Sequence, residues 1–404
     1  MKLQRRFLKD IATFSNGINF DKSAYGEGVK IINVSDFGEL FSPNYELLSE
    51  VKKEYVRKND YLYNGDIVFV RSNGNKELIG RCMLIIELKE PITYSGFCIR
   101  CRITELNLYN PVYLTYYFKS ESFRRVLTGN AVGANIQNLS QSRLSNVILA
   151  IPSIEKQNRI ADILSAYDNL IENNQKQIKL LEEAAQRLYK EWFVDLRFPG
   201  HETTPIVDGV PEGWKIRKVS DFGEVITGKT PSTSHSEFFG GDIPFVKIPD
   251  MHNCVFSVST EGMLTELGAN SQKKKYIPKD SIMVSCIATV GLVNISVQTC
   301  QTNQQINSIV LAKHQDLYYL YFCMKGIRSL LDGVGSNGAT MTNVNKSKFE
   351  NLNVIYPTDK LIEKFFTICK PFFTDIFKLS IMNQKLKEAR DRLLPKLMSG
   401  EIEV

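Results

Sequence analysis

The sequence predicts a mixed α/β (α+β) protein in which two similar domains of short strands and helices are joined by two long helices. Three observations predict this fold class. An apolar seam at helical spacing runs through residues 154–193, a second copy of it lies near the end of the chain, and both halves contain short β-rich segments bounded by turn residues. We expect each long helix to bury its apolar seam against the other, as in a coiled coil.

The bulk properties of the chain agree with a two-domain protein. Its 404 residues are too many for one small core, and 43% hydrophobic with 23% charged residues is typical of a globular protein. The net charge of +6 is compatible with a polyanionic partner but does not require one. No apolar run approaches the roughly 18 residues of a membrane span, and the N-terminus lacks an apolar signal core, so we expect a cytoplasmic protein without membrane contact.

Residues 1–150 form the first predicted domain. Its expected strands lie near residues 30–34, 65–71, 81–88 and 97–103, and an aromatic-rich helix over 110–127 ends at Gly129. A polar, basic loop from Arg71 to Lys76 connects two of the strands. Such a loop suits contacts with phosphates and base edges, although a solvated hairpin tip is about as good an interpretation.

The segment 151–198 is predicted to be the central long helix. No Gly or Pro interrupts it from Ser153 to Phe193, so it forms a rod of about 60 Å. An Asn at one seam position costs stability but fixes register and partner choice. The seam consists of Ile160, Leu164, Tyr167, Ile171, Asn174, Ile178, Leu181, Ala185, Leu188 and Trp192.

The second half repeats the first. A shift of 205 residues places Gly133 on Gly338 and Pro152 on Pro357, without a gap between 133–188 and 338–393. We therefore expect a second domain over 199–355 and a distal long helix over 356–404. Pro371 predicts that this helix starts or kinks there. The copied seam consists of Phe365, Cys369, Phe372, Ile376, Leu379, Asn383, Leu386, Arg390, Leu393 and Leu397, with Arg390 as its one misfit.

Two further segments support the repeat. Leu8–Gly17 parallels Val219–Gly228, and Gly65–Val70 parallels Lys279–Val284. Between these anchors the two halves differ almost entirely. A shared frame with different loops is what two copies of one binding scaffold with two targets would show.

Two apparent catalytic motifs do not fit their surroundings. Gly223–Thr230 matches the P-loop pattern, but its interior is strand-like and no helical periodicity follows Lys229. Asn110–Tyr113 is close to an adenine-methyltransferase motif, but one Pro is missing and no Gly-rich cofactor loop is present.

The remaining residues also indicate recognition without chemistry. The only CxxC pair, Cys98 and Cys101, has no second pair or nearby His, so reduced core cysteines are favoured over a metal site. The four histidines are dispersed. We therefore expect a non-catalytic recognition subunit.

The chain resembles the DNA-specificity subunits of type I restriction–modification enzymes. The resemblance is carried by Leu149–Leu164 leading into the helix that ends at Phe193, by Gly133–Ser140, by Pro211–Trp214, by Gly228–Ser232 and by the tail Lys387–Ile402. It spans the whole chain in order. It departs mainly at Asp359–Lys364, which leaves the start of the second long helix open.

The resemblance implies that each domain is a target-recognition domain reading one part of a bipartite double-stranded DNA target. The two long helices would pack antiparallel as a coiled coil in a pseudo-two-fold arrangement, and their length would set the gap between the half-sites. The two copies of the scaffold would bind two modification subunits, which are adenine methyltransferases. Restriction subunits would add translocation and cleavage. S-adenosylmethionine, ATP and Mg are expected on those partners, with no cofactor or metal in this chain.

Candidate residues follow from these predictions. The DNA-contact candidates are Arg71, Ser72, Asn73, Lys76, Lys229, Thr230, Ser232 and Thr233. The helical-spacer candidates are Leu164, Ile171, Asn174, Ile178, Leu181, Leu188, Ile376, Asn383, Leu386 and Leu393. The alternatives are a P-loop-type nucleotide-binding protein and a coiled-coil scaffold that does not bind DNA.

Overall fold

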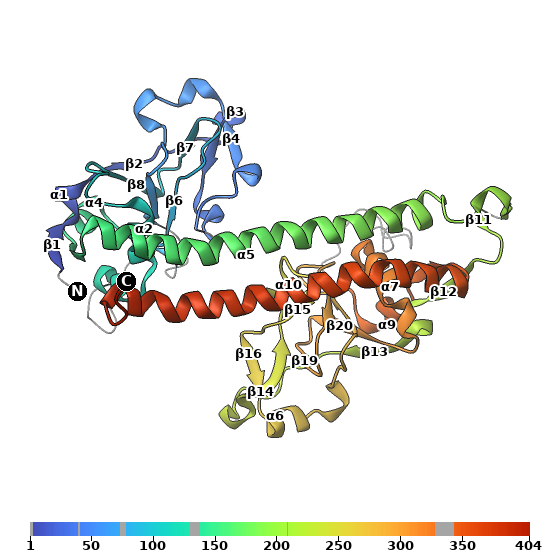
Figure 1. The fold of residues 1–404 in the computed structure, drawn as a ribbon. Helices are drawn as coiled ribbons and strands as arrows, with labels where there is room; N and C mark the ends of the chain where they lie inside the picture. Colours follow the sequence, from blue (N-terminus) through green and yellow to red (C-terminus); the bar gives the residue numbers. More distant parts are fainter. Residues whose placement is uncertain (1–2, 39–40, 73–77, 129–137, 208, 328–342) are drawn as a thin grey trace. The chain divides into compact units, whose positions relative to one another are not determined.

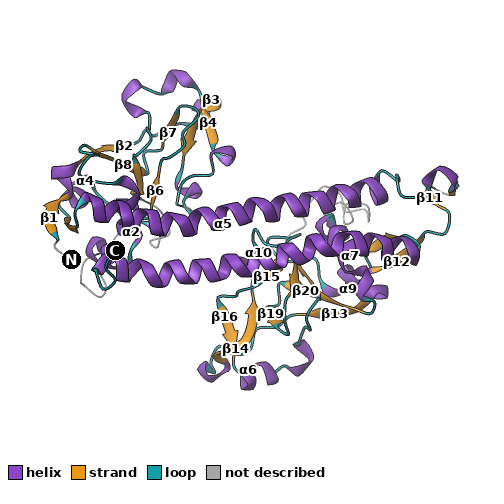
Figure 2. Ribbon diagram, viewed as in Figure 1, coloured by secondary structure: helices purple, strands orange, loops and turns teal. Residues whose placement is uncertain are grey.

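The computed structural model describes residues 3–38, 41–72, 78–128, 138–207, 209–327 and 343–404 (Figure 1). The chain divides into two compact units. Unit 1 contains Met1–Ile171 and Leu386–Val404, and unit 2 contains Glu172–Lys385. Each unit combines small sheets with part of each of the two longest helices (Figure 2).

In unit 1, a four-stranded antiparallel sheet in the order β2-β8-β5-β6 lies beside a three-stranded sheet in the order β4-β3-β7. β3 pairs antiparallel with β4 and parallel with β7, and β1 forms a ribbon with β9. The strands are β1 (Gln4–Phe7), β2 (Ala12–Asn16), β3 (Tyr25–Ile32), β4 (Ser49–Val51), β5 (Ile67–Val70), β6 (Cys82–Leu84), β7 (Ile92–Tyr94), β8 (Cys98–Ile103) and β9 (Ile148–Ile151). The helices are α1 (Leu8–Ile11), α2 (Pro111–Lys119), α3 (Glu121–Thr128), α4 (Gln141–Ser145) and the start of α5 (Ile154–Tyr189).

Unit 2 shares this strand arrangement, with one further strand at the edge of its larger sheet. Its larger sheet has the order β13-β20-β17-β18-β15, its smaller sheet the order β16-β14-β19, and β12 pairs with β21. The strands are β10 (Ile206–Val207), β11 (Val210–Pro211), β12 (Lys215–Lys218), β13 (Gly223–Thr227), β14 (Phe239–Val246), β15 (Phe256–Ser257), β16 (Gly262–Leu264), β17 (Ile282–Ser285), β18 (Val293–Ser296), β19 (Gln301–Thr302), β20 (Ile306–Leu311) and β21 (Asn353–Tyr356). The helices are α6 (Glu266–Asn270), α7 (Leu317–Lys325), α9 (Lys346–Glu350) and α10 (Asp359–Ser399).

The predicted fold class and internal repeat are confirmed. β14 pairs antiparallel with β16 and parallel with β19, as β3 does with β4 and β7. A shift of 205 residues maps α4 onto α9, β9 onto β21 and the first residue of α5 onto that of α10. The two halves therefore fold as copies of one scaffold.

One predicted parallel is wrong by one residue. The sequence paired Gly65–Val70 with Lys279–Val284, but the strand registers make Ile67 the counterpart of Ile282. Val70 pairs with Cys98 and Ser285 pairs with Ile306, which gives the same offset. The correction matters because a shift of one residue would move every side chain to the opposite face of the sheet.

The two faces of β5 pack into different cores. Ile67 and Phe69 join the cluster that contains α2, α4 and the long helices, whereas Val68 and Val70 join the cluster under the three-stranded sheet. In β17, Ile282 and Val284 belong to the helix-side cluster. These central strands are buried on both faces, which explains why their sequences are almost continuously apolar.

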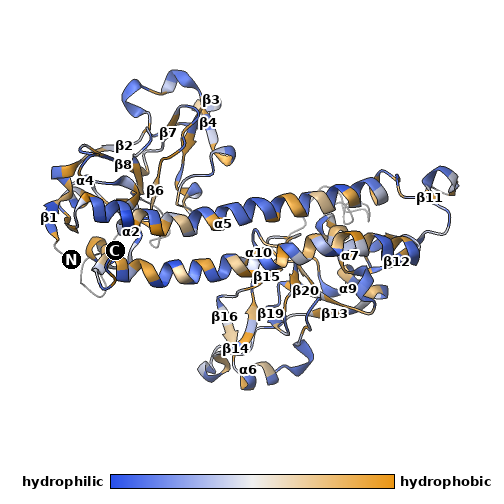
Figure 3. Cartoon of the chain, viewed as in Figure 1, coloured by the Kyte–Doolittle hydropathy of each residue, from blue (hydrophilic) through white to orange (hydrophobic). Residues whose placement is uncertain are grey.

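Within unit 1, the beginning of α5 packs against the end of α10. Leu164 and Leu397 share one core cluster, and Asp168 on α5 accepts a hydrogen bond from Arg390 on α10. Lys156 Nζ, near the start of α5, is 3.6 Å from Glu403 Oε1, which follows the end of α10. Residue numbers therefore increase along α5 in the direction in which they decrease along α10. Apolar bands along both helices are visible in Figure 3. The helices are therefore antiparallel in this unit.

Within unit 2, the remainder of α5 packs against the beginning of α10. Ala185 shares a core cluster with Phe365, Cys369 and Ile376, and Ile178, Leu181 and Leu188 pack against that cluster. The predicted seam Asn residues meet, since the Asn174 side-chain amide donates to Asn383 Oδ1 at 2.8 Å.

The start of the distal helix corrects one prediction. α10 begins at Asp359, and Pro371 lies inside it, so no helix starts at this proline. Proline removes one backbone donor and costs about 3 kcal/mol in a helix interior. Pro371 is exposed, whereas Cys369 and Phe373 on either side are buried in the core. We attribute the continuity of α10 to this packing.

The aromatic-rich segment also differs from the prediction. The single helix expected over 110–127 is two helices, because Ser120 adopts an extended backbone with ψ 147°. Ser120 Oγ donates to the Tyr117 carbonyl oxygen at 2.6 Å and accepts from the Phe123 amide at 3.3 Å. The hydroxyl thus stabilises the break.

Candidate nucleic-acid interface

Three loops of the first domain meet where the two sheets adjoin. They are the segment after β2, the turn between β7 and β8, and the segment after β5. The amide of Ile18 donates to the Tyr94 carbonyl oxygen at 3.2 Å, and the amide of Gly96 donates to the Ile18 carbonyl oxygen at 2.7 Å. The amide of Arg71 donates to the Phe97 carbonyl oxygen at 2.8 Å. Backbone hydrogen bonds therefore hold these loops together.

The second domain repeats two of these three bonds at the corresponding positions. The amide of Lys229 donates to the Thr302 carbonyl oxygen at 2.9 Å, as Ile18 does in the first domain. The amide of Cys286 donates to the Gln305 carbonyl oxygen at 2.8 Å, as Arg71 does. We call this set of loops the loop frame: residues 17–19, 71–72 and 95–97 in the first domain, and 228–230, 286–287 and 303–305 in the second.

In each domain, the residues just before α4 or α9 also form a backbone hydrogen bond with the loop frame. The amide of Leu139 donates to the Arg71 carbonyl oxygen at 2.8 Å, and the amide of Val344 donates to the Cys286 carbonyl oxygen at 2.8 Å. The loop frame is thereby anchored to the residues just before α4 and α9.

Close backbone approach explains the two glycines that the sequence comparison aligned. A Cβ atom on Gly17 would lie 2.3 Å from the Tyr94 and Ser95 carbonyl oxygens. A Cβ atom on Gly228 would lie 2.2 Å from the Asn303 carbonyl oxygen. Only glycine fits at either position, because these contacts are with backbone atoms.

The side chains on this common backbone differ in chemistry. Ile18 corresponds to Lys229, Arg71 to Cys286 and Phe97 to Gln305, according to the repeated hydrogen bonds. Hydrogen-bonding groups thus stand in one domain where apolar groups stand in the other. A rigid backbone with exchanged side chains can present two different recognition surfaces.

The first-domain candidates lie partly in this frame. Arg71 is half-buried, and its Nη1 donates to the Gly96 carbonyl oxygen at 3.4 Å. Ser72 forms an isolated bridge with Asn138. Asn73 and Lys76 lie outside the described residues.

The second-domain candidates form a connected loop after β13. Lys229 is exposed, and Thr230 Oγ1 donates to Gln304 Oε1 at 2.8 Å. Ser232 and Thr233 are exposed, and the Ser232 hydroxyl lies 2.7 Å from that of Ser234. These residues offer a cation and hydroxyls of the kind that bind phosphate oxygens.

The candidates from the two domains occupy different positions of the repeat. Arg71 follows β5, whereas Lys229 follows β13, the counterpart of β2. The sequence analysis therefore did not identify, for the candidates of each domain, the residues at the equivalent positions of the other domain. Ile18 is the counterpart of Lys229, and the aligned Gly17 and Gly228 could have shown it. The exposed ring of Phe97 was also missed, because nothing in its local sequence marks it.

The P-loop-like segment lacks the geometry that nucleotide binding requires. Gly223–Thr227, the interior of the motif, is strand β13, and residues 228–235 form a loop. A P-loop needs a helix that begins near its Lys. Lys229 instead belongs to the loop frame.

The CxxC pair is split between two cores. Cys98 packs under the three-stranded sheet and Cys101 packs on the helix side, since they point to opposite faces of β8. Burial raises the pKa of the Cys98 thiol to about 12. Over the described ranges, His, Cys, Asp and Glu side chains form no group of three or more that could hold a metal ion.

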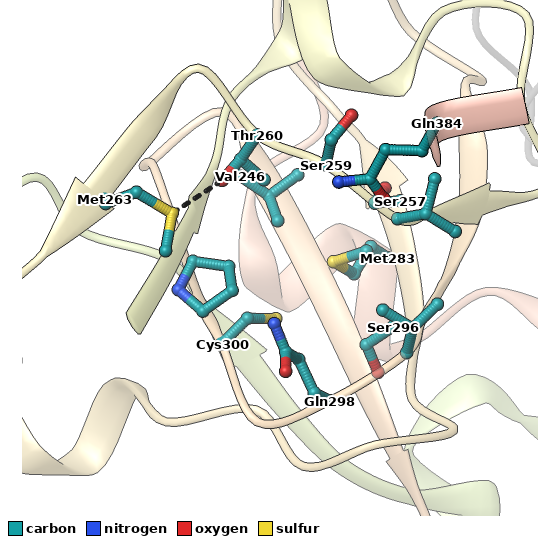
Figure 4. Close-up of a pocket in the computed structure, with 13 residues that line it drawn as sticks. Val246, Ser257, Ser259, Thr260, Met263, Met283, Ser296, Gln298, Cys300 and Gln384 are labelled. Atoms are coloured by element: carbon teal, nitrogen blue, oxygen red, sulfur yellow. Dashed lines mark hydrogen bonds between the residues drawn. The ribbon is translucent and has the colours of Figure 1, made fainter. Parts of the chain in front are cut away.

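Unit 2 contains a neutral pocket of about 220 Å³ beside its two sheets (Figure 4). Hydroxyls of Ser257, Ser259 and Thr260 line it together with the sulfur-containing side chains of Met263 and Met283. Thr260 Oγ1 donates to Met263 Sδ at 3.4 Å. None of the residues that line this pocket is Asp, Glu, His, Lys or Arg.

One family model matches both halves of this chain, and known proteins are similar to it over most of its length. A family model described as the type I restriction modification DNA specificity domain matches residues 2–183 and again residues 211–388. The specificity subunit of the type I restriction enzyme HindI from Haemophilus influenzae is 32% identical, covering 95% of this chain and 96% of that protein. The MjaIX specificity subunit from Methanocaldococcus jannaschii is 29% identical, covering 72% of this chain and 69% of that protein.

A solved structure is similar in fold. The crystal structure of the S subunit of a type I restriction-modification system from M. genitalium has a TM-score of 0.56 and 14% sequence identity, covering 98% of this chain and 96% of that chain. At that identity the likeness concerns the fold alone. Among the described helices of this chain, none has the length and apolarity of a membrane span.

Proposed function

This chain belongs to the type I restriction modification DNA specificity family, and we propose that each of its two domains reads one part of a bipartite DNA target. The observation that carries this proposal is the loop frame. Its backbone hydrogen bonds recur in both domains, while the side chains at Arg71 and Cys286, or at Ile18 and Lys229, differ. Each domain can then present its own side chains to the bases at an equivalent place on the scaffold.

In the loop frames and in the loop that follows β13, different residue types suit different contacts with DNA. Arg71 can bond bidentately to a guanine edge, and Gln304 and Gln305 can bond to adenine. Lys229 and the hydroxyls of Thr230, Ser232 and Thr233 suit phosphate contacts, which hold the protein in register on the duplex.

The two long helices supply the distance between the two reading sites. α5 spans 36 residues and α10 spans 41, so each is a rod of roughly 55–60 Å, against about 34 Å for one turn of DNA. The gap between the two parts of the target then depends on helix length.

The chain acts in this proposal as a non-catalytic subunit that assembles with partners. Two modification subunits, which methylate adenine with S-adenosylmethionine, would bind the two copies of the scaffold, one each. Restriction subunits would supply ATP- and Mg-dependent translocation and cleavage.

The test is the adenine-methylation pattern of the host genome with the gene intact, deleted and restored. Deletion is expected to remove one split motif, two short specific parts around a fixed gap, and restoration is expected to return it. An unchanged pattern in a host that expresses the neighbouring methyltransferase would overturn the proposal. Mixing the purified chain with that methyltransferase and a duplex carrying the motif provides the same test in solution.

A further inference from the structure

The neutral pocket of unit 2 can be compared with the equivalent place in the first domain, because the two domains are copies of one scaffold. In the first domain, Tyr45 packs against the core under the three-stranded sheet. Its hydroxyl donates to the Ile86 carbonyl oxygen at 2.7 Å and accepts from the Ile86 amide at 3.3 Å. The backbone of one residue thus holds the hydroxyl end of the phenol ring.

Five residues that line the pocket have counterparts in this part of the first domain. Strand registers identify them, since Ile67 pairs with Leu84 in the first domain. Their counterparts, Ile282 and Ile295, pair in the second domain. Repeated backbone hydrogen bonds give the same correspondence. The pairs are Ile32 with Val246, Val68 with Met283, Ile85 with Ser296, Ile86 with Val297, and Ile92 with Cys300.

These positions surround different contents in the two domains. In the first domain, four of them belong to the buried core cluster against which Tyr45 packs. In the second domain, their counterparts border about 220 Å³ of open space. The four residues of the first domain are Ile32, Val68, Ile85 and Ile92.

The segment that carries Tyr45 explains this difference. Tyr45 lies four residues before Ser49, the first residue of β4. Val258 lies four residues before Gly262, the first residue of the equivalent strand β16, and it lines the pocket. A valine side chain lacks the ring and the hydroxyl of tyrosine. The pocket is therefore the space that a phenol ring fills in the first domain.

The size and the lining of the pocket suit one aromatic ring. A protein cavity of about 150 Å³ holds benzene, so about 220 Å³ accommodates a ring with a substituent. Met263 on β16 and Met283 on β17 line the pocket from the two sheets (Figure 4). Methionine sulfur makes favourable contacts with aromatic rings.

The polar groups of the pocket favour a neutral ligand that carries a hydroxyl. Ser257 is 8% exposed, and its Oγ atom has no hydrogen-bond partner among the described residues. A buried hydroxyl without a partner costs free energy, which a bond to a ligand hydroxyl would offset. An ion would lose its hydration without gaining a counter-charge, because none of the lining residues is charged. Ser259 and Gln298 are exposed, so the pocket borders the solvent.

We propose that this pocket binds a small neutral phenol. The ring lies between Met263 and Met283, and the hydroxyl bonds to the backbone of Val297, the counterpart of the bond that holds the tyrosine in the first domain. Ser257 Oγ supplies a second polar contact. Such a site is independent of the proposed DNA recognition, so either can fail without the other.

A matched pair of valine variants isolates the pocket. Val258→Tyr introduces the residue that stands at the equivalent position of the first domain, and its ring is expected to fill the space. Val207→Tyr adds the same ring on β10, at a position that is 52% exposed. Ser257→Ala is a smaller change, and it keeps the test valid if Val258→Tyr does not fold. Urea unfolding midpoints establish that the compared variants are folded.

The measurement is the binding of p-cresol, the tyrosine side chain as a free molecule, to the full chain by isothermal titration calorimetry. We expect one equivalent to bind. Toluene, which lacks the hydroxyl, should bind at least threefold more weakly. Val258→Tyr should weaken p-cresol binding at least tenfold, with Val207→Tyr within twofold of the unsubstituted chain. Ser257→Ala should weaken p-cresol binding at least threefold and leave toluene binding within twofold.

The proposal is overturned if the unsubstituted chain does not bind p-cresol at millimolar concentration, or if folded Val258→Tyr binds it as tightly as Val207→Tyr does. Equal affinity for p-cresol and toluene would also overturn it, because the pocket would then be an apolar packing space. If Val258→Tyr does not fold, unchanged p-cresol binding by Ser257→Ala has the same consequence.

Discussion

Asn174 and Asn383 form a buried amide pair in unit 2, with the Asn174 Nδ2 donating to Asn383 Oδ1 at 2.8 Å. Their exposed fractions are 5% and 7%. The two residues come from the seams of α5 and α10, where the neighbouring positions are mostly apolar. Any sliding of one helix along the other would bury both amides against apolar side chains. The pair therefore favours one register.

Replacing either Asn alone is predicted to destabilise the protein. Asn174→Leu or Asn383→Leu leaves the other buried amide without this hydrogen bond, which costs about 1–3 kcal/mol. The double variant is expected to cost less than the sum, because the hydrogen bond between the two amides can be lost only once. Urea unfolding of the four proteins measures this coupling. Asn173→Leu, at an exposed neighbouring position, should change the free energy of unfolding by no more than about 0.5 kcal/mol. Additive single effects would contradict the pairing.

The long helices were the most predictable part of the fold. A seam that recurs every three or four residues is a local signal, and the 205-residue shift maps the first residue of α5 onto that of α10. The seam positions of Asn174 and Asn383 were predicted, but their hydrogen bond to each other was not, because it depends on the register of the two helices. No helix starts at Pro371, because burial of Cys369 and Phe373 outweighs the local preference of proline.

The sheets and the loop frame were less predictable, because they depend on contacts between distant residues. No local pattern shows that β3 pairs in parallel with β7, or that Arg71 bonds to Phe97. The sequence did locate Arg71 and Lys229 in exposed or half-buried loops. It could not show that they stand at different positions of the repeat, because that relation emerges only from strand register.

The cysteines are predicted to react slowly in the native protein. Burial raises the pKa of the Cys82, Cys254, Cys286 and Cys323 thiols to about 11, and of the Cys98, Cys300 and Cys369 thiols to about 12. At pH 8 a thiol with a pKa near 11 is a thiolate in about one molecule in a thousand. Labelling with Ellman's reagent should therefore be slow until urea unfolds the chain. A thiol that reacts equally fast in both states would contradict its burial.

The same thiols predict a loss of stability at high pH. Their pKa is about 9 when unfolded and higher when folded, so between these values the folded state binds more protons. The stabilisation is complete below pH 9 and falls as the pH rises through about 11 to 12. The urea midpoint should accordingly decrease from pH 8.5 to pH 10.5. A midpoint that rises over this interval would be inconsistent with the buried thiols.

Arg71 and Lys229 are predicted to affect DNA recognition in different ways. Arg71→Ala should cost about 1–3 kcal/mol of duplex affinity and relax one position of the methylated motif. Lys229→Ala should weaken binding to all duplexes alike and reduce the salt slope by about one, leaving the motif unchanged. Methylome sequencing and a salt series separate these outcomes. If Arg71→Ala alters neither the motif nor the affinity, its assignment as a base-reading residue fails.

Helix length is predicted to set the gap in the target. Inserting one heptad after Ile178 in α5, with a matching heptad before Leu379 in α10, preserves the apolar seam and the Asn174–Asn383 pair. Seven residues lengthen each rod by about 10 Å, or roughly three base pairs, and the insertion rotates the flanking parts by only about 20°. We expect the methylated motif to keep both specific parts while its gap widens. Inserting the heptad in α5 alone should abolish methylation, because the two seams no longer match. A gap of unchanged length in the doubly extended protein would show that another element measures the distance.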